Sequence, residues 1–389
     1  MNNYNKLHNE TKVIIAIDSF KCCAKSNELA QEIKKGVLDV YKKADILICP
    51  IADGGEGTVE ALSSSKGSRI ISTTCSNPLS EQIEAQYVIL NDNTAVIEMA
   101  SASGLELISK EKRNPSITTT YGTGELIKDA IKKGIRDFII GIGGSATNDA
   151  GLGMLRSLGF KFFDKSNSEI TLAKELGKIV KIDKSKSLKE LKECKFSVAC
   201  DVTNPLFGKN GASYVYAKQK GADEKMTLHL DEQLKLFSKI VQSEHAKKLD
   251  QHPGSGAAGG LGFGFLAFLN AELKSGIEII MEYIDIKNKI KDADFVITGE
   301  GKIDNQSSMG KVLSGIGKIC KEQGVTCIAL SGNTSQTDKS INEIGISACF
   351  SILNSPMNLN QAMNKQNTLN MIRKKTEQIF RLIRATSKT

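Results

Sequence analysis

Acidic side chains that follow short apolar runs are the residues of this 389-residue chain best suited to do chemistry. Such runs are typical of buried strands, so these carboxylates are expected at the carboxyl ends of strands, where parallel sheets bind their ligands. There they could hold a metal ion or accept a proton. Any single one could instead be a loop residue or a helix cap. The set is Asp18, Asp53, Glu98, Asp201, Glu300 and Asp304.

A second candidate is the small-residue segment GGSATND at residues 143–149, which follows the apolar run 138–142. Small residues let a backbone approach a ligand closely, while hydroxyls and exposed N–H groups bind anionic oxygens. The start of a following helix would favour an anion at the same place. The segment therefore predicts a phosphate or carboxylate site. Its expected members are Gly143, Gly144, Ser145, Thr147 and Asn148, with positive charge available from Lys21 and Lys311.

Residues 254–259 match the pattern GxGxxG, but a polar helical stretch precedes them where a dinucleotide-binding fold requires a strand. This excludes the dinucleotide interpretation and favours a flexible or substrate-closing glycine loop that opens a helix over 261–273. Two other nucleotide signatures, GxxxxGK[ST] and the paired HRD and DFG motifs, do not occur in the sequence.

The order of the predicted elements places these candidates in two lobes. A strand at 12–17, a helix from 26 to 41 and a strand at 45–51 form a βαβ unit, and the same alternation returns after residue 294. The middle of the chain has shorter strands and a weaker rhythm. We therefore expect an α/β protein with a doubly wound parallel-sheet lobe built from both chain ends, 1–72 and 288–389. A second, mixed α/β lobe is inserted at 73–287.

The composition of the chain limits the kinds of ligand and partner that it is expected to bind. The net charge is +8, but the lysines are spread through amphipathic helices without a basic block interleaved with aromatic residues. This favours a solvated surface or an anionic small substrate over nucleic acid. Four scattered histidines and nine cysteines without a CxxC pair argue against a zinc site, and the N-terminus has no apolar segment. We expect a cytoplasmic protein that does not enter a membrane.

Phosphoryl transfer needs donors around the phosphates, a cation, carboxylates that hold Mg²⁺, and a group that orients or deprotonates the acceptor hydroxyl. Each part has a candidate here. The residues alone therefore indicate an α/β protein that binds a phosphorylated or carboxylated small molecule.

Ten ordered motifs resemble those of the bacterial glycerate kinase family, of the type without a P-loop. The resemblance runs from about Lys12 to the C-terminal helix, and so covers nearly the whole chain. The motifs are DSFK at 18–21, PIADGGEG at 50–57, IEMASASG at 97–104, TTYGTGEL at 119–126, GIGGSATND at 141–149, ACDVTNPL at 199–206, QKG at 219–221, PGSGAAGGLG at 253–262, ADFVITGEGKID at 293–304 with QS at 306–307, and GK at 310–311.

The resemblance implies transfer of the ATP γ-phosphate to D-glycerate with Mg²⁺, usually at the 2-hydroxyl, giving 2-phosphoglycerate. It also implies two α/β domains with the active site in the cleft between them. A kinase that forms 3-phosphoglycerate, a kinase for another small hydroxy acid, and a non-catalytic regulator that binds glycerate or a nucleotide remain alternatives. The chain is expected to be a monomer or a homodimer.

The resemblance also suggests roles for the charged candidates. Asp18 and Asp53 are candidates for the general base or for orienting the glycerate hydroxyl, and Lys21 for neutralising a phosphate or the substrate carboxylate. The Mg²⁺ ligands are expected to be Asp201, Glu300 and Asp304. Asp201 is also a candidate catalytic residue. The alternatives are that Asp18 caps the first helix, that Lys21 is a surface lysine, and that Asp201 makes an Asx-turn.

Three residues depart from the family pattern. Cys22 and Ala150 stand where the family usually has glycine, and Leu313 stands where proline is common. We expect the loop around Ala150 to tolerate its extra methyl if the φ angle there is negative, which makes Cys22 the more doubtful of the two replacements.

Overall fold

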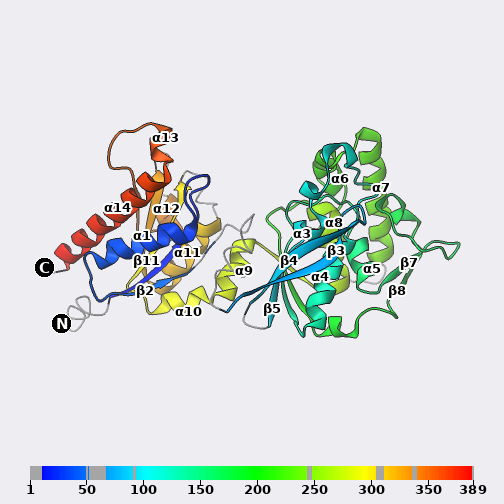
Figure 1. The fold of residues 1–389 in the computed structure, drawn as a ribbon, viewed down its shortest axis with the longest axis horizontal. Coiled ribbons are helices and arrows are strands. Elements are labelled where there is room, and N and C mark those ends of the chain that lie inside the picture. Colours follow the sequence, from blue (N-terminus) through cyan, green and yellow to red (C-terminus); the bar gives the residue numbers. More distant parts are fainter. Residues whose placement is uncertain are drawn as a thin grey trace. The chain divides into compact units, whose positions relative to one another are not determined.

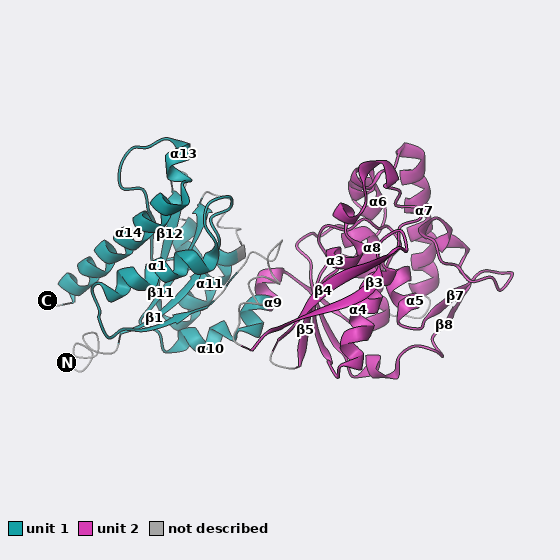
Figure 2. Cartoon of the chain, in the orientation of Figure 1, with its two compact units in different colours: residues 1–53, 280–389 teal, residues 54–279 magenta. Residues whose placement is uncertain are grey.

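The computed structural model describes residues 11–49, 51, 67–90, 93–242, 248–303, 311–334 and 340–387. The chain forms two compact units (Figures 1 and 2). Unit 1 contains Met1–Asp53 and Ile280–Thr389, and unit 2 contains Gly54–Ile279. Each unit has its own sheet with helices packed on it, which confirms the predicted α/β class.

Across the described residues of unit 1, five parallel strands form one sheet in the order β13-β12-β11-β1-β2. The strands are β1 (Lys12–Ile17), β2 (Asp45–Ile48), β11 (Phe295–Lys302), β12 (Thr326–Asn333) and β13 (Ala348–Ser351). The chain runs from β1 outward to β2, and later from β11 outward the other way. The order therefore reverses between β1 and β11, and ligands of such sheets bind beyond the strand ends at this switch point.

Helices pack on both faces of this sheet. On one face, α1 (Ser26–Leu38) and α14 (Lys365–Thr386) share an apolar cluster with alternate residues of β1, among them Val13 and Ile15. The helix α11 (Lys311–Gln323) supplies Cys320, whose thiol contacts that of Cys327 on β12. Cys327 alternates with Ile328 of the first cluster, so α11 lies on the opposite face. This confirms the predicted doubly wound sheet. The shorter helices of unit 1 are α10 (Ile286–Lys291), α12 (Ser340–Glu343) and α13 (Leu359–Ala362).

The sheet of unit 2 is mixed. Its order within the described chain is β10-β9-β6-β5-β4-β3, antiparallel from β3 to β5 and parallel beyond. The strands are β3 (Arg69–Ser76), β4 (Gln82–Leu90), β5 (Thr94–Glu98), β6 (Asp137–Gly141), β9 (Lys195–Ala199) and β10 (Glu272–Lys274), with a separate pair β7 (Lys161–Phe163) and β8 (Lys181–Asp183). The helices are α3 (Ala100–Ser103), α4 (Tyr121–Lys132), α5 (Leu152–Ser157), α6 (Ala212–Tyr216), α7 (Glu224–Gln242) and α8 (Ala257–Leu269), and α9 (Gly276–Tyr283) spans the junction of the units.

The two units meet along the chain at residues 53/54 and 279/280, whereas the sequence suggested boundaries near 72 and 288. One part of the first difference, residues 69–72, has a simple cause. The strand β3 already begins at Arg69 and pairs with β4 over its whole length, so residues 69–72 belong to the sheet of unit 2. An active-site cleft between the lobes stays a prediction.

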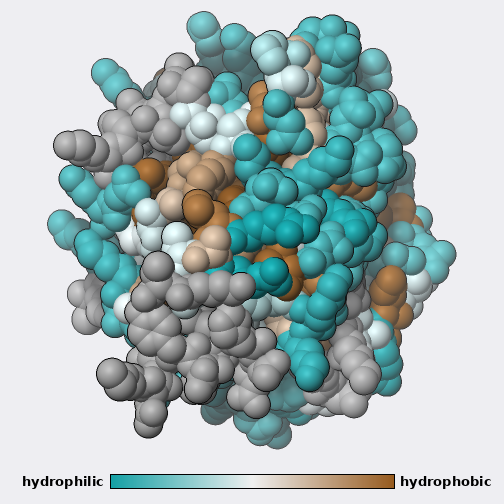
Figure 3. All heavy atoms as spheres, turned by 90° about the vertical axis from the view of Figure 1, so that its left-hand side faces the viewer, coloured by the Kyte–Doolittle hydropathy of each residue, from teal (hydrophilic) through white to brown (hydrophobic). Residues whose placement is uncertain are grey.

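The surface and the lengths of the helices fit the solvated surface expected from the composition. The face of the molecule drawn in Figure 3 is mainly hydrophilic, with small apolar patches between polar side chains. Among the described residues, no helix is both long and apolar enough to cross a membrane.

The two replacements of glycine both adopt left-handed backbone conformations. Cys22 has φ 59° and Ala150 has φ 51°. The negative φ on which tolerance of the extra methyl at Ala150 was conditional is therefore absent. A left-handed conformation costs a residue with a Cβ roughly 1–2 kcal/mol, because Cβ approaches the following carbonyl oxygen. Cys22 is exposed, in a turn closed by the hydrogen bond from the Cys23 N–H to the Phe20 carbonyl.

We expect Cys22→Gly to raise the free energy of unfolding by about 0.5–1 kcal/mol, since the relief of the left-handed strain exceeds the extra chain entropy of glycine. The matched control is Cys22→Ala, which removes the thiol but keeps Cβ, and it should leave stability nearly unchanged. Urea denaturation measures both. A Cys22→Gly variant no more stable than Cys22→Ala would contradict this account of the turn.

Candidate functional site

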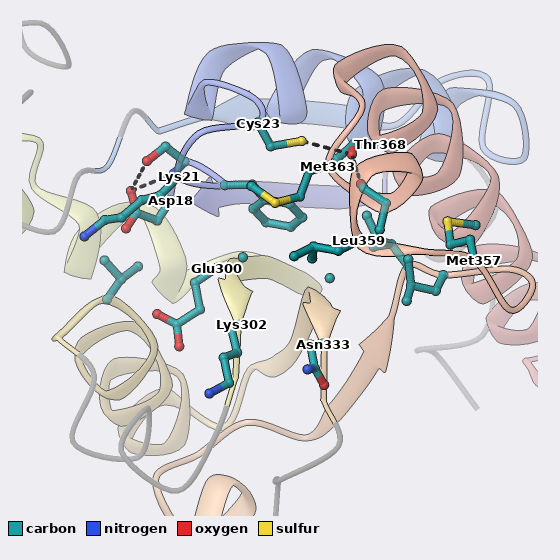
Figure 4. A pocket seen from close by; sticks show the side chains of 18 residues that line it. Asp18, Lys21, Cys23, Glu300, Lys302, Asn333, Met357, Leu359, Met363 and Thr368 are labelled. Carbon is teal, nitrogen blue, oxygen red and sulfur yellow. Dashed lines mark hydrogen bonds between the residues drawn. The ribbon is translucent and has the colours of Figure 1, made fainter.

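Unit 1 contains a cavity of about 800 Å³ at the carboxyl ends of β1, β11 and β12. Polar and charged residues line one part of it, and Figure 4 shows Asp18, Lys21, Glu300 and Lys302 toward one side. Toward the other side, apolar side chains come from the segment between β13 and α14, including Met357, Leu359 and Met363. The complete lining is Asp18, Ser19, Phe20, Lys21, Cys23, Glu300, Gly301, Lys302, Val312, Gly332, Asn333, Ile352, Leu353, Met357, Leu359, Ala362, Met363 and Thr368.

Asp18 is held at the switch point of the sheet. Its N–H donates to the Gly299 carbonyl of β11 at 3.0 Å, and its carboxylate accepts the Ser19 N–H at 2.6 Å. The side chain is buried. The first helix, α1, begins only at Ser26, with Lys25 in the capping position, so Asp18 does not cap it. Asp18 is instead fixed in the wall of the cavity.

Glu300 reaches the same cavity from β11. The preceding Gly299 is required by close packing, because a Cβ there would lie 2.0 Å from the Leu330 carbonyl oxygen of β12. Lys21 and Lys302 are exposed on the cavity lining and supply positive charge. The structure thus brings together three residues that the sequence singled out separately: Asp18, Lys21 and Glu300.

The other predicted site residues do not all fall here. Asp53 and Asp304 lie outside the described residues. Lys311 begins α11, and its side chain is likewise outside the described part. Asp201 belongs to unit 2, where its exposed carboxylate accepts the Gly276 N–H at 3.4 Å. Over the described ranges, no group of three or more His, Cys, Asp or Glu side chains could hold a metal ion by itself.

The glycine-rich loop after β6 lies in unit 2 and divides into an exposed and a buried part. Gly143 and Gly144 are exposed, whereas the side chains of Ser145, Thr147 and Asn148 are buried. Thr147 Oγ1 and Asn148 Oδ1 have no hydrogen-bond partner within the described chain, while the Asn148 amide donates to Ser213 at 3.1 Å. The exposed backbone of the two glycines is therefore the part of the loop open to a ligand.

Asp149 fixes the shape of this loop from inside unit 2. Its buried carboxylate accepts four hydrogen bonds, from the N–H and Oγ1 of Thr120 at 2.9 Å each and from the N–H groups of Gly151 and Gly153 at 3.1 Å each. Burial raises the pKa of Asp149, and these hydrogen bonds oppose that rise. The carboxylate thereby ties the loop to the starts of α4 and α5.

Lys220 is a further charged residue at this loop, and its sequence motif suggested no role for it. It is only 1% exposed, and its Nζ donates to Ser145 Oγ and to the Thr147 carbonyl, both at 2.7 Å. Burial lowers the pKa of Lys220 to about 7, against the opposing attraction of Asp149. The motif QKG at 219–221 could have pointed to this residue. The sequence does not distinguish one buried lysine from the many exposed lysines of the chain.

The glycine stretch at the start of α8 packs against the same loop. Ala258, Gly259 and Gly260 all have left-handed φ angles, and a Cβ on Gly259 would lie 2.0 Å from the Thr147 carbonyl oxygen. Residues 254–259 were expected to be a flexible or substrate-closing loop. The structure shows a close-packed support for the Gly143–Asp149 segment instead.

We therefore expect Gly259→Ala to destabilise unit 2 by about 1–3 kcal/mol more than Gly134→Ala, because only the first change forces a methyl group against a backbone oxygen. Both glycines have left-handed φ angles and belong to unit 2, but nothing lies within 4 Å of a Cβ on Gly134. Thermal unfolding of the two variants measures the difference. Equal midpoints would show that the contact with Thr147 is not close in solution.

The lowered pKa of Lys220 predicts a pH dependence of stability. Between pH 7 and about 10.4 the unfolded chain retains the lysine proton that the folded chain has lost, so the free energy of unfolding rises with pH. Relative to Lys220→Met, the wild type should gain stability across this window and show a constant difference below it. Urea denaturation of both proteins at several pH values tests the slope. A difference that stays flat or falls from pH 7 to 10 would contradict a neutral buried amine.

Comparison with known proteins identifies the family of this chain. The model of the glycerate kinase family matches residues 13–384. A glycerate kinase of Halalkalibacterium halodurans is 43% identical over 360 residues, covering 92% of this chain and 94% of that protein. The glycerate 2-kinase of Escherichia coli K12 is 44% identical over 353 residues, covering 90% and 93%. A solved structure from Salmonella typhimurium LT2, of a protein assigned as glycerate kinase 2, superposes with a TM-score of 0.86 at 38% identity and covers 98% of this chain and 100% of that one. The chain belongs to the glycerate kinase family.

Proposed function

We propose that this protein transfers the γ-phosphate of ATP to the 2-hydroxyl of D-glycerate, giving 2-phospho-D-glycerate and ADP. ATP-dependent phosphorylation of glycerate follows from the family and from its similarity to named glycerate kinases. The 2-hydroxyl is proposed because a relative at 44% identity is named glycerate 2-kinase. The observation that carries the proposal is the cavity in unit 1, where two carboxylates and two lysines meet at the switch point of a parallel sheet.

The carboxylates of this cavity fit a magnesium ion. Mg²⁺ prefers oxygen ligands and is usually bound by one or two carboxylates together with substrate phosphates and water. Asp18 and Glu300 provide two carboxylates on one cavity wall, and we propose that they hold the ion with the phosphates. Bound there, Mg²⁺ would neutralise charge on the phosphates. Asp201 and Asp304, the other predicted ligands, stay predictions.

The charge of each remaining side chain in the cavity suggests its role. Lys21 and Lys302 are placed to attract the phosphates and to balance negative charge that builds up on the transferred group. Asp18 also remains a candidate for orienting or deprotonating the glycerate hydroxyl, a role that the sequence equally suggested for Asp53. Because Asp18 is buried and anchored to β11, it would keep its position through the reaction.

We propose that the Gly143–Asp149 loop binds an anionic group of a substrate. Two exposed glycines offer backbone to a phosphate or carboxylate, and Lys220 is bound to Ser145 and Thr147 of the same loop. The proposal extends to a cytoplasmic enzyme, monomeric or homodimeric, without a nucleic-acid partner.

Incubation with ATP, Mg²⁺ and D-glycerate, followed by ³¹P NMR of the products, tests the proposed reaction. We expect the signal of 2-phosphoglycerate. A signal of 3-phosphoglycerate would keep the kinase and overturn the choice of hydroxyl. ATP binding without phosphorylation of glycerate would overturn the proposed activity.

If Glu300 contributes to the magnesium site, Glu300→Gln should lower kcat/KM by about 10²–10³-fold and raise the Mg²⁺ concentration needed for half-maximal activity, because a neutral amide is a weaker ligand. Glu322→Gln is the matched control, since Glu322 lies on α11 in a surface ion pair with Lys287 and does not line the cavity. A Mg²⁺ titration at fixed ATP measures the effect. An unchanged Mg²⁺ requirement in folded Glu300→Gln would rule out this ligand.

A further inference from the structure

The apolar part of the unit 1 cavity has no role in phosphate or metal binding as described so far. It is formed by the chain between β13 and α14, and its most exposed members are Leu359, at 71%, and Met363, at 39%. These side chains face a cavity whose opposite side carries Asp18, Lys21, Glu300 and Lys302 (Figure 4). A single cavity thus combines an uncovered apolar wall with a charged wall.

The apolar wall is held in place by its own hydrogen bonds. In α13, Asn358 and Gln361 cap each other, with the Gln361 N–H donating to Asn358 Oδ1 at 2.9 Å and the Asn358 N–H donating to Gln361 Oε1 at 3.1 Å. The buried Thr368 of α14 donates to the Ala362 carbonyl at 2.9 Å, and its Oγ1 lies 3.1 Å from the thiol of Cys23. The exposed leucine and methionine therefore stand on an anchored segment.

The size and chemistry of the cavity indicate which of the two kinase substrates, glycerate or the nucleotide, contacts the apolar wall. Glycerate has three carbons, a carboxylate and two hydroxyls, and so has no apolar surface for this wall to cover. Ligand pockets of about 300–1,000 Å³ suit drug-sized molecules, and 800 Å³ falls within that range. A nucleotide has an aromatic base at one end and phosphates at the other, which matches the two walls. Unbranched thioethers such as Met357 and Met363 also make favourable contacts with aromatic rings.

We propose that the wall formed by Met357, Leu359 and Met363 is the subsite for the purine base of the nucleoside triphosphate, with the phosphates directed toward Lys21, Lys302 and the carboxylates at the switch point. The nucleotide is thereby assigned to unit 1. The inference rests on the proposed kinase function. It goes beyond that function in naming the unit and the side chains that bind the base.

Leu359→Ser tests this subsite, and Leu382→Ser is its matched control. Leu382 is 61% exposed on α14 of the same unit but does not line the cavity. Calorimetry measures two probes that need no turnover: ADP, which has a base, and inorganic tripolyphosphate, which has none. We expect Leu359→Ser to weaken ADP binding about tenfold, as loss of roughly 1.4 kcal/mol of contact would, and to leave tripolyphosphate binding unchanged. Leu382→Ser should change neither.

A second variant, Met363→Gln, keeps the length of the side chain. It should also weaken the binding of ADP and leave the binding of tripolyphosphate unchanged. ADP affinity within twofold of wild type in both cavity variants would overturn the inference, as would an equal loss in Leu382→Ser or no ADP binding by the wild type. Steady-state kinetics separate this result from the proposed function. If glycerate is phosphorylated with an unchanged KM for ATP in Leu359→Ser, the base subsite fails and the kinase stands. If ADP binds as expected but glycerate is not phosphorylated, the subsite stands and the proposed function fails.

Discussion

The parallel pairing of β1 with β11 is the constraint on which the candidate active site depends. It joins Val13 to Phe295 in register and brings Ile17 opposite Gly299, so the ends of two strands from opposite parts of the chain lie side by side. The hydrogen bond from the Asp18 N–H to the Gly299 carbonyl continues this pairing by one residue. The strand order reverses here, and Asp18 and Glu300 both line the cavity at these strand ends. Asp18, Lys21, Glu300 and Lys302 all lie on these two strands or in the segment directly after β1.

Unit 2 positions its loop by a different means, since buried polar groups determine the loop's shape. Asp149 binds four donors from inside the unit, and Lys220 binds two oxygens of the loop itself. Buried ionisable groups are costly unless they are hydrogen-bonded, which is why both are fully engaged here. The left-handed alanines Ala150 and Ala258 add local strain at the contact between the loop and α8. A loop built in this way presents Gly143 and Gly144 from a fixed support.

The sequence predicted what local patterns determine. Apolar runs identified strands such as β1, β2 and β6, but not β3 or β10. The rule for strand ends selected Asp18 and Glu300, and the motifs identified the family. Three features could not be predicted, because they depend on tertiary contacts. The burial of Lys220 depends on packing between distant segments, the positive φ of Ala150 on its hydrogen bond to Gly259, and the apolar cavity wall on where α13 is anchored. The sequence grouped residues 69–72 with the chain ends because the pairing of β3 with β4 is not visible in the composition of either strand.

Asp18 and Glu300 are proposed to act on the same phosphates from the two strands at the switch point. A double-mutant cycle on kcat/KM with Asp18→Asn, Glu300→Gln and the double variant tests it most directly, because residues that share one ligand give non-additive losses. If the site is shared, the double variant should lose much less activity than the product of the two single losses. Losses that multiply, in variants that remain folded, would show that the two carboxylates act independently and would contradict a shared site.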